Sequence, residues 1–227
     1  MQNSDISGWQ MVTPASKRVV IWGAGDQFRV NWPILVSNEV QVVAFIDQTR
    51  NLTSPVQGIP LFNTLDDFLS SLTVLTKSDI GSVICIGNPF SKERLEYSNL
   101  LAQEGFNPIS FADGTSLIRK SAIFDFGLQV MPKALIHNNV RIGSSCIVNT
   151  GALIEHDCVI GSGVEIGPGA ILTGRVEIED HVWIGAGAVV LPRLKIGNGS
   201  IVGAGAVVTK DIPPNTVVVG SPARAIK

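Results

Sequence analysis

The chain has 227 residues, which suits two ordinary domains, and its 45 % apolar against 16 % charged residues exclude a largely disordered protein. A formal net charge of −2 without basic runs excludes the electrostatic pattern of a nucleic-acid binder. No apolar run approaches the roughly 20 residues of a membrane span, no signal peptide is evident, and three scattered cysteines favour a reducing cytoplasm.

The first half of the chain alternates between strand and helix patterns. Residues 1–17 are polar and are predicted to form a flexible arm. Buried-strand patterns follow at 18–22, 40–46, 82–86 and 109–111. Helix patterns lie at 27–38, after a cap at Asn63 or Thr64, and at 91–104. Because strands that alternate with helices form parallel sheets with covered faces, we predict a small Rossmann-like α/β domain over 18–115.

A glycine-rich turn follows the first strand of this domain. Gly23-Ala24-Gly25 stands between a strand and a helix, and Asp47 ends the next strand about twenty residues later. This arrangement is typical of loops that bind phosphate groups. A dinucleotide dehydrogenase is one alternative, although Phe28 stands where the third glycine of GxGxxG belongs. A tight turn without any ligand is the other.

A strict six-residue period begins at Ile118. Every sixth residue from there to Val208 is hydrophobic, over sixteen consecutive positions. The period fits neither a helix nor a plain alternating strand; it is typical of a hexapeptide solenoid, in which each repeat forms one flat side of a coil. We predict an all-β solenoid over 116–213, with the periodic residues in its core, followed by a C-terminal tail over 214–227.

Longer motifs in both halves resemble those of a known family. They are GAGD (23–26), FID (45–47), QGIPLF (57–62), ICIGNP (84–89), NTGALIEHDCVIG (149–161), HVWIGAGAVV (181–190), GAGAVVTKDIPP (203–214) and VVGSPARAI (218–226). The chain resembles bacterial sugar O-acyltransferases of the sialic acid O-acetyltransferase type, and related N-acetyltransferases acting on nucleotide-linked amino sugars. The resemblance implies a left-handed parallel β-helix, acetyl-CoA as acyl donor, and a homotrimer with active sites between subunits.

The period also predicts a catalytic column. If three hexads close one coil, residues 18 apart stack about 4.8 Å from one another, so His156 lies between Asn138 and Gly174. Acyl transfer from a thioester needs a base and a donor for the developing oxyanion. We predict the His156 imidazole and the Gly174 N–H in these roles, and Lys210 on a coenzyme phosphate. The alternative is an ordinary surface histidine at a corner.

The resemblance implies further roles. Asp157 would orient the imidazole of its neighbour, His156. The nucleotide of a nucleotide-sugar acceptor would bind at Gly23, Gly25, Asp47 and Asn88, and the coenzyme would run past Gly174, Ala186, Gly187, Gly205 and Lys210. In two places the chain departs from the family pattern. Glu165 replaces a second histidine that would contact the acceptor, and Asp26-Gln27 replaces the usual Gly-His after GAG.

The sequence thus predicts an acetyl-CoA-dependent acetyltransferase acting on the amino or hydroxyl group of a nucleotide-activated sugar, by direct transfer. Alternatives are an O-acetyltransferase of sialic acid or another surface glycan sugar, a non-catalytic solenoid scaffold, and a metal-dependent lyase or hydrolase on the same fold. We expect no metal site, because His137 and His181 occupy different positions in their hexads and neither should stack with His156.

Overall fold

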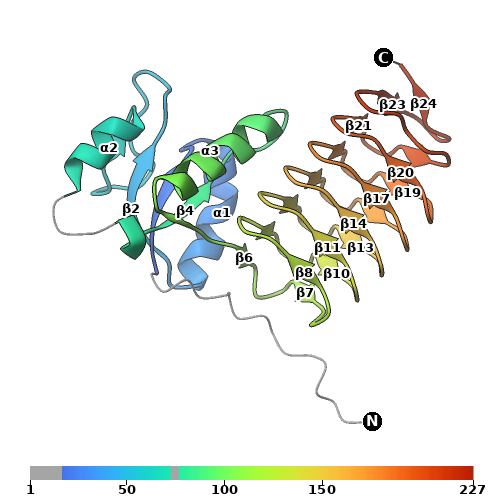
Figure 1. Cartoon of the computed structure of the whole chain (residues 1–227), viewed down its shortest axis with the longest axis horizontal. Helices are drawn as coiled ribbons and strands as arrows, with labels where there is room; N and C mark the ends of the chain where they lie inside the picture. The colour runs from blue at the N-terminus through green and yellow to red at the C-terminus, as the bar shows by residue number, and fades with distance from the viewer. Residues whose placement is uncertain (1–16, 73–76, 227) are drawn as a thin grey trace, which may run out of the picture. The chain divides into compact units, whose positions relative to one another are not determined.

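The computed structural model describes residues 17–72 and 77–226 (Figure 1). Apart from Lys17, the predicted arm lies outside the described residues. Contacts divide the chain into two compact units, with the division between Phe111 and Ala112. Among the described residues, no helix combines the length and the apolar character that crossing a membrane requires.

The N-terminal unit is built on a five-stranded parallel sheet of strand order β3-β2-β1-β4-β5. Its strands are β1 (Arg18–Trp22), β2 (Gln41–Ile46), β3 (Leu61–Phe62), β4 (Gly81–Ile84) and β5 (Asn107–Pro108). Its helices are α1 (Asp26–Ser37), α2 (Leu65–Ser71) and α3 (Ser91–Gln103), with a short 3-10 turn, η1 (Lys77–Asp79). Thr64 begins α2 as predicted, because its hydroxyl accepts a hydrogen bond from the Asp67 N–H.

The strand predicted at 109–111 is wrong. The last strand of the parallel sheet is β5 at 107–108, and Phe111 already belongs to the first strand of the solenoid. Ala112 stands one hexad before Ile118 and so takes the first inward position, and the Asp113 N–H next to it donates to Val130 O, 2.9 Å away. The six-residue period therefore starts earlier than its aliphatic residues indicate.

The C-terminal unit is a coil with three flat faces, each a sheet of short strands. Face 1 consists of β6 (Phe111–Ala112), β9 (Gln129–Val130), β12 (Ile147–Val148), β15 (Glu165–Ile166), β18 (Trp183–Ile184), β21 (Ile201–Val202), β23 (Val217–Val219) and β24 (Arg224–Ala225). Face 2 consists of β7 (Leu117–Ile118), β10 (Leu135–Ile136), β13 (Leu153–Ile154), β16 (Ile171–Leu172), β19 (Val189–Val190) and β22 (Val207–Val208). Face 3 consists of β8 (Ile123–Phe124), β11 (Arg141–Ile142), β14 (Val159–Ile160), β17 (Glu177–Ile178) and β20 (Lys195–Ile196).

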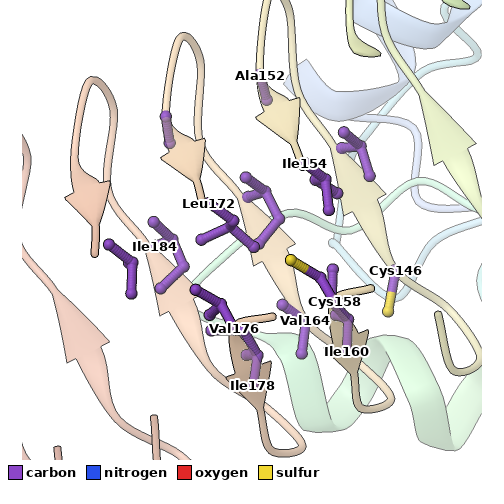
Figure 2. Close-up of a cluster of buried hydrophobic side chains, with 14 of the residues drawn as sticks. Cys146, Ala152, Ile154, Cys158, Ile160, Val164, Leu172, Val176, Ile178 and Ile184 are labelled. Atoms are coloured by element: carbon purple, nitrogen blue, oxygen red, sulfur yellow. The ribbon is translucent and has the colours of Figure 1, made fainter. Parts of the chain in front are cut away.

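The register of these sheets is 18 residues, as the period predicts. Ile154, for example, pairs with Ile136 on one side and Leu172 on the other. The inward residues form one continuous core, which Figure 2 shows in its middle coils. Each buried aliphatic side chain contributes ~1.5–3 kcal/mol before the entropy cost of folding. The predicted tail is not separate, because β23 and β24 extend face 1.

Each corner of the coil needs one residue in the left-handed backbone region. The corner between faces 1 and 2 (corner 1–2) uses Gly151, Gly169, Gly187 and Gly205, with φ between +65° and +67°. The corner between faces 2 and 3 (corner 2–3) uses Asn139, Asp157, Arg175 and Arg193, with φ between +59° and +62°. Glycine adopts this conformation without strain, so the left-handed position of corner 1–2 carries no side chain from Gly151 to Gly205, whereas that of corner 2–3 projects polar groups into solvent.

Candidate active site

His156 lies at corner 2–3, between β13 and β14, and its side chain points out of the coil with 50 % of its surface exposed. It lies directly over Gly174 on the next coil: a Cβ atom on Gly174 would be 2.7 Å from His156 Nε2. At that separation, any side chain at position 174 would displace the imidazole. Glycine at position 174 is therefore what lets the imidazole lie against the backbone of the next coil.

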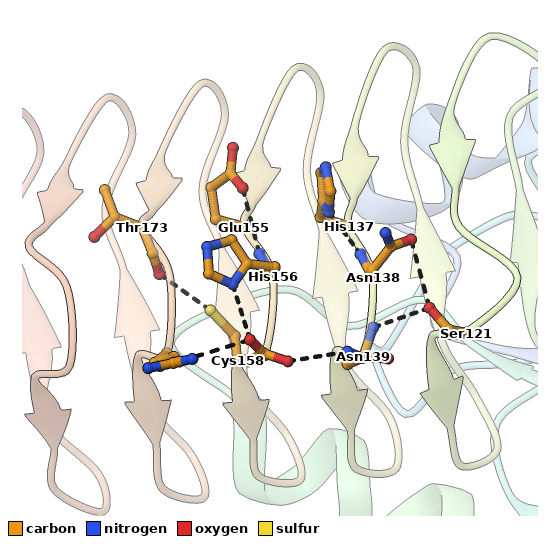
Figure 3. A network of polar contacts seen from close by, with 10 residues as sticks. Ser121, His137, Asn138, Asn139, Glu155, His156, Cys158 and Thr173 are labelled. Carbon is orange, nitrogen blue, oxygen red and sulfur yellow. Dashed lines mark hydrogen bonds and ion pairs between the residues drawn. The ribbon is translucent and has the colours of Figure 1, made fainter.

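The other ring nitrogen of His156 faces Asp157. Nδ1 lies 2.9 Å from Asp157 Oδ2, and the Asn139 side-chain amide donates to Asp157 Oδ1 at 3.1 Å (Figure 3). The Arg175 Nε is 3.6 Å from the same carboxylate. The hydrogen bonds from His156 and Asn139 lower the pKa of Asp157, so this group is a carboxylate at neutral pH. A carboxylate on Nδ1 favours the tautomer with its proton there, which leaves the Nε2 lone pair available as a base.

The Gly174 N–H is available as a donor. Its neighbours Thr173 and Arg175 donate to carbonyl groups of adjoining coils, whereas the Gly174 N–H donates to none of the described residues. Equivalent amides on the two preceding coils are occupied by side chains: the Asn138 N–H donates to His137 Nδ1, and the His156 N–H to Glu155 Oε2. Stabilisation of an oxyanion requires a hydrogen-bond donor that no other group occupies. The Gly174 N–H meets this requirement and lies beside the imidazole.

The prediction that His137 stays apart from His156 is wrong. The two ring centroids are 6.3 Å apart with the rings edge to face, as Figure 3 shows from the side. Their positions in the hexad differ by one residue, but the rings lie on successive coils of the same corner. His181 lies at the corner between faces 3 and 1. Among the described residues, no group of three His, Cys, Asp or Glu could hold a metal ion.

The residues predicted to bind the coenzyme occupy two different corners. Ala186, Gly187 and Gly205 lie at corner 1–2, where a Cβ on either glycine would meet nothing within 4 Å. Lys210 is exposed at the end of the His156 column, at corner 2–3. Face 2 separates the two corners in one protomer. The structure thus places an open edge at corner 1–2 and the His156–Asp157 pair at corner 2–3, and does not bring them together within a single chain.

The residues predicted to bind the nucleotide gather around the Gly-rich loop. Asp47 Oδ2 accepts from the Ala24 N–H at 2.8 Å, and its Oδ1 accepts from the Thr49 N–H at 2.9 Å. Gly23 is required by the fold itself, since its φ is +101° and a Cβ there would be 2.5 Å from Cys85 O. Gly25 is open to solvent at the start of α1. Asp47 therefore holds the loop in shape.

Asn88 and Asp26 lie next to the Gly-rich loop. Asn88 follows β4 and precedes Pro89 through a cis peptide bond, at the same edge of the sheet as the loop. Ligands of open parallel sheets bind at this carboxyl edge. The Asp26 side chain is 98 % exposed and pairs with Arg29, so its charge faces solvent and not the loop.

Glu165 does not lie with His156. It stands on face 1, opposite corner 2–3, and only 9 % of its surface is exposed. The Asn149 side-chain amide donates to its Oε1 at 3.1 Å. Sequence reasoning missed the roles of Asn139 and Asn149 as hydrogen-bond donors to carboxylates; Asn139, exactly one coil before Asp157, could have been found from the 18-residue register.

Cys158 directly follows His156 and Asp157 in the chain, and its nucleophilic thiol points inward. Burial raises the pKa of its thiol to about 11, and the thiol donates to Thr173 O. A neutral, buried thiol is a poor nucleophile. We therefore expect Cys158→Ala to keep turnover within ~3-fold of the wild type, because the change removes little volume and no reacting group. Steady-state release of coenzyme A checks this, and loss of all turnover in a folded variant would point to an acyl-enzyme.

Comparison with known proteins agrees with this geometry. The bacterial transferase hexapeptide family (six repeats) matches residues 133–174 and 175–210. A search of curated proteins found no match. Among solved structures, the acetyltransferase domain of PglB from Neisseria gonorrhoeae FA1090, in complex with acetyl coenzyme A, is 29 % identical with a TM-score of 0.83. The alignment covers 93 % of this chain and 100 % of that one.

Two further structures are similar over nearly their whole lengths. A mutant of perosamine N-acetyltransferase from Caulobacter crescentus, in complex with CoA and GDP-perosamine, is 28 % identical with a TM-score of 0.82, covering 92 % of this chain and 96 % of that one. WeeI from Acinetobacter baumannii AYE is 31 % identical with a TM-score of 0.79, covering 92 % and 100 %. The predicted Rossmann-like domain and left-handed parallel β-helix are confirmed. The chain belongs to the hexapeptide-repeat acetyltransferases.

Proposed function

We propose that this protein transfers the acetyl group of acetyl-CoA to the amino group of a nucleotide-activated sugar, with His156 as the general base. The observation that carries the proposal is the imidazole held between the Asp157 carboxylate and the backbone of Gly174, whose N–H has no acceptor among the described residues. Similar structures hold acetyl coenzyme A in one case, and CoA with GDP-perosamine in another.

The mechanism follows from the two sides of the imidazole. Nε2 takes a proton from the sugar amine as its nitrogen attacks the thioester carbonyl, while Asp157 stabilises the imidazolium that forms. The Gly174 N–H donates to the oxyanion of the tetrahedral intermediate. The C–S bond then breaks, and the coenzyme A thiolate leaves and receives the proton from Nε2. No metal and no covalent enzyme intermediate takes part.

The two substrates approach from different parts of the protein in this proposal. The nucleotide of the acceptor binds at Gly23, Gly25 and Asn88, on the loop that Asp47 holds in shape. The coenzyme lies along Ala186, Gly187 and Gly205 and meets Lys210 with a phosphate group. Glu165 contacts the acceptor of a neighbouring active site. Three buried free thiols, Cys85, Cys146 and Cys158, support a reducing cytoplasm as the compartment.

A homotrimer would bring the two corners together. The outward positions of face 2 form a ladder of aliphatic side chains, all partly exposed: Leu117, Leu135, Leu153, Ile171, Val189 and Val207. The outward positions of face 3 are mixed, with charged Arg141, Glu177 and Lys195 as well as apolar Ile123 and Val159. A continuous apolar face beside the catalytic corner supports a subunit contact. A neighbour seated there places its bare corner 1–2 next to His156, and the coenzyme binds between them.

The trimer is tested by placing a charge on face 2. We expect Ile171→Glu to convert the assembly from about three times the chain mass of 24.1 kDa to a single chain, because an unpaired buried carboxylate costs several kcal/mol. Light scattering after size-exclusion chromatography measures the mass. Val159→Glu, on exposed face 3, is the matched control and should remain a trimer. A face 2 variant that still forms trimers would place the interface elsewhere.

The activity itself is tested by release of coenzyme A. Purified protein is given acetyl-CoA and a panel of nucleotide sugars, in pairs that carry either an amino or a hydroxyl group at the same carbon. Free thiol is followed over time, and the product is identified by mass spectrometry. We expect release that depends on an amino sugar. A folded protein that binds acetyl-CoA but releases no thiol with any acceptor would indicate a non-catalytic scaffold.

A further inference from the structure

The Asp157 carboxylate has a neighbour on each adjoining coil of corner 2–3. Asn139, Asp157 and Arg175 stand 18 residues apart in one column, and each has a backbone φ between +59° and +62°. Because the backbone conformation repeats, the three side chains leave the coil at the same corner, about 4.8 Å apart along the axis. The carboxylate therefore lies between one possible donor on the preceding coil and one on the following coil.

The two neighbours contact Asp157 differently. The Asn139 side-chain amide donates to Oδ1 at 3.1 Å, and within the part of the chain that the structure describes it is the one donor to this oxygen. The Arg175 Nε lies 3.6 Å from Oδ2, beyond hydrogen-bond distance, and its side chain is 57 % exposed. A contact between exposed charges at that distance is weak and screened by salt. Asn139 is thus the neighbour that fixes the carboxylate.

Asn139 is itself held in place. Its backbone N–H donates to Ser121 Oγ at 3.1 Å, and the Ser121 hydroxyl donates to Asn138 Oδ1 at 3.4 Å (Figure 3). Because an ionised carboxylate only accepts hydrogen bonds, Asn139 presents its amide nitrogen to Asp157. A chain of hydrogen bonds therefore runs from Ser121 over three coils to His156 Nδ1.

The bond from Asn139 restricts the orientation of the carboxylate. Rotation of this group would break the contact at Oδ1, so Oδ2 stays 2.9 Å from His156 Nδ1. That contact in turn keeps the ring where Nε2 lies against Gly174. The Asp157 side chain is 37 % exposed, so without Asn139 the carboxylate could rotate and bind water. The position of the base therefore depends on a side chain one coil away.

We propose that Asn139 is a positioning residue, which holds the Asp157 carboxylate in the orientation that fixes the place and the tautomer of the His156 imidazole. The proposal rests on the proposed function, because it assigns Asn139 to the acyl transfer that His156 performs. The effect of Asn139 on turnover passes through Asp157.

The first test removes the amide and keeps the backbone. Asn139→Gly does this, because glycine adopts a positive φ without strain. We expect kcat to fall by ~10-fold or more, the effect of losing one hydrogen bond to a charged group. Both KM values should stay within ~3-fold of the wild type, because no proposed substrate contact is lost. Steady-state release of coenzyme A measures these values.

Two further variants make this test specific. Asn215→Gly is the matched control: it is the same substitution at an exposed residue with a φ of +55°, at the corner between faces 3 and 1, and it should keep the wild-type kcat. Asn139→Asp keeps the shape of the side chain but removes the donor, so it should lower kcat as well and replaces Asn139→Gly if that variant fails to fold. Wild-type kcat in a folded Asn139→Gly would overturn the proposal.

A double-mutant cycle distinguishes positioning from a structural role. Asp157→Gly removes the carboxylate at a residue whose φ of +59° also suits glycine. Adding Asn139→Gly to this variant should change the remaining kcat by less than ~2-fold, because the two residues act through one contact. If Asn139→Gly lowered kcat by the same factor with and without the carboxylate, Asn139 would act on the fold and not on the base.

The tautomer of His156 can be observed without turnover. The chain has three histidines, so nitrogen NMR of protein labelled with ¹⁵N-histidine gives few signals, and the His156 signals are those lost in His156→Ala. We expect the neutral ring to carry its proton on Nδ1 in the wild type and in Asn215→Gly, and to become a mixture of tautomers in Asn139→Gly. An unchanged tautomer in Asn139→Gly would contradict the proposal. A protein that shows the expected change yet acetylates no acceptor would contradict the proposed function and leave the positioning of the imidazole standing.

Discussion

His156→Ala is expected to lower kcat by ~10²–10⁴-fold, the usual contribution of a general base. The imidazole is half exposed and packs against glycine, so its removal leaves the core of the β-helix intact. The acetyl-CoA KM should change little, because the proposed coenzyme contacts lie elsewhere. Steady-state release of coenzyme A at saturating acceptor measures the loss, and the melting temperature verifies that the fold is kept.

A histidine at another corner provides the control for this variant. His181→Ala removes the same side chain from the corner between faces 3 and 1, and should retain most of the wild-type turnover. If His156→Ala kept more than half of the wild-type kcat, the imidazole would have no part in proton transfer. A loss of equal size in both variants would indicate a general effect on the fold.

The pH dependence of turnover separates the two members of the catalytic pair. Because hydrogen bonds lower the pKa of Asp157, its charge and any stability it adds are fully present above the ordinary carboxyl pKa of ~4. The charge of Asp157 and its contribution to stability are lost only as the pH falls below ~4, through the lowered pKa of this carboxyl group. A fall in kcat at milder acidity therefore reports a group other than this carboxylate.

The six-residue period made the backbone of the β-helix predictable. It places His156 next to Gly174 through register alone, since equal spacing repeats the same backbone position on every coil. The structure shows that stacking directly. The period also separates inward from outward residues, and the buried positions of Cys146 and Cys158 follow from it.

The six-residue period does not predict the directions of the side chains at the corners. His137 and His156 occupy different positions in their hexads, yet their ring centroids on successive coils are only 6.3 Å apart. Buried contacts such as that between Asn149 and Glu165 depend on rotamers that no spacing fixes. The sequence did not predict the start of the coil, because Ala112 is small and does not continue the series of large aliphatic residues that begins at Ile118.

One column of the β-helix thus links the features that acyl transfer needs. The same hexad position is occupied, on successive or later coils, by Lys120, Asn138, His156, Gly174 and Lys210. A solenoid favours such an arrangement, because each coil adds one residue to the column at a fixed spacing.

Gly174→Ala is expected to lower kcat by ~10²-fold without unfolding the protein, because a small displacement of a catalytic group has an effect of that size. The new Cβ would lie 2.7 Å from His156 Nε2, so the imidazole must rotate away and lose its 2.9 Å contact with Asp157. The backbone N–H remains, which isolates the position of the base as the cause. Gly114→Ala, where a Cβ meets nothing within 4 Å, is the control and should keep full turnover. Wild-type turnover in Gly174→Ala would show that the reaction does not need the imidazole in this position.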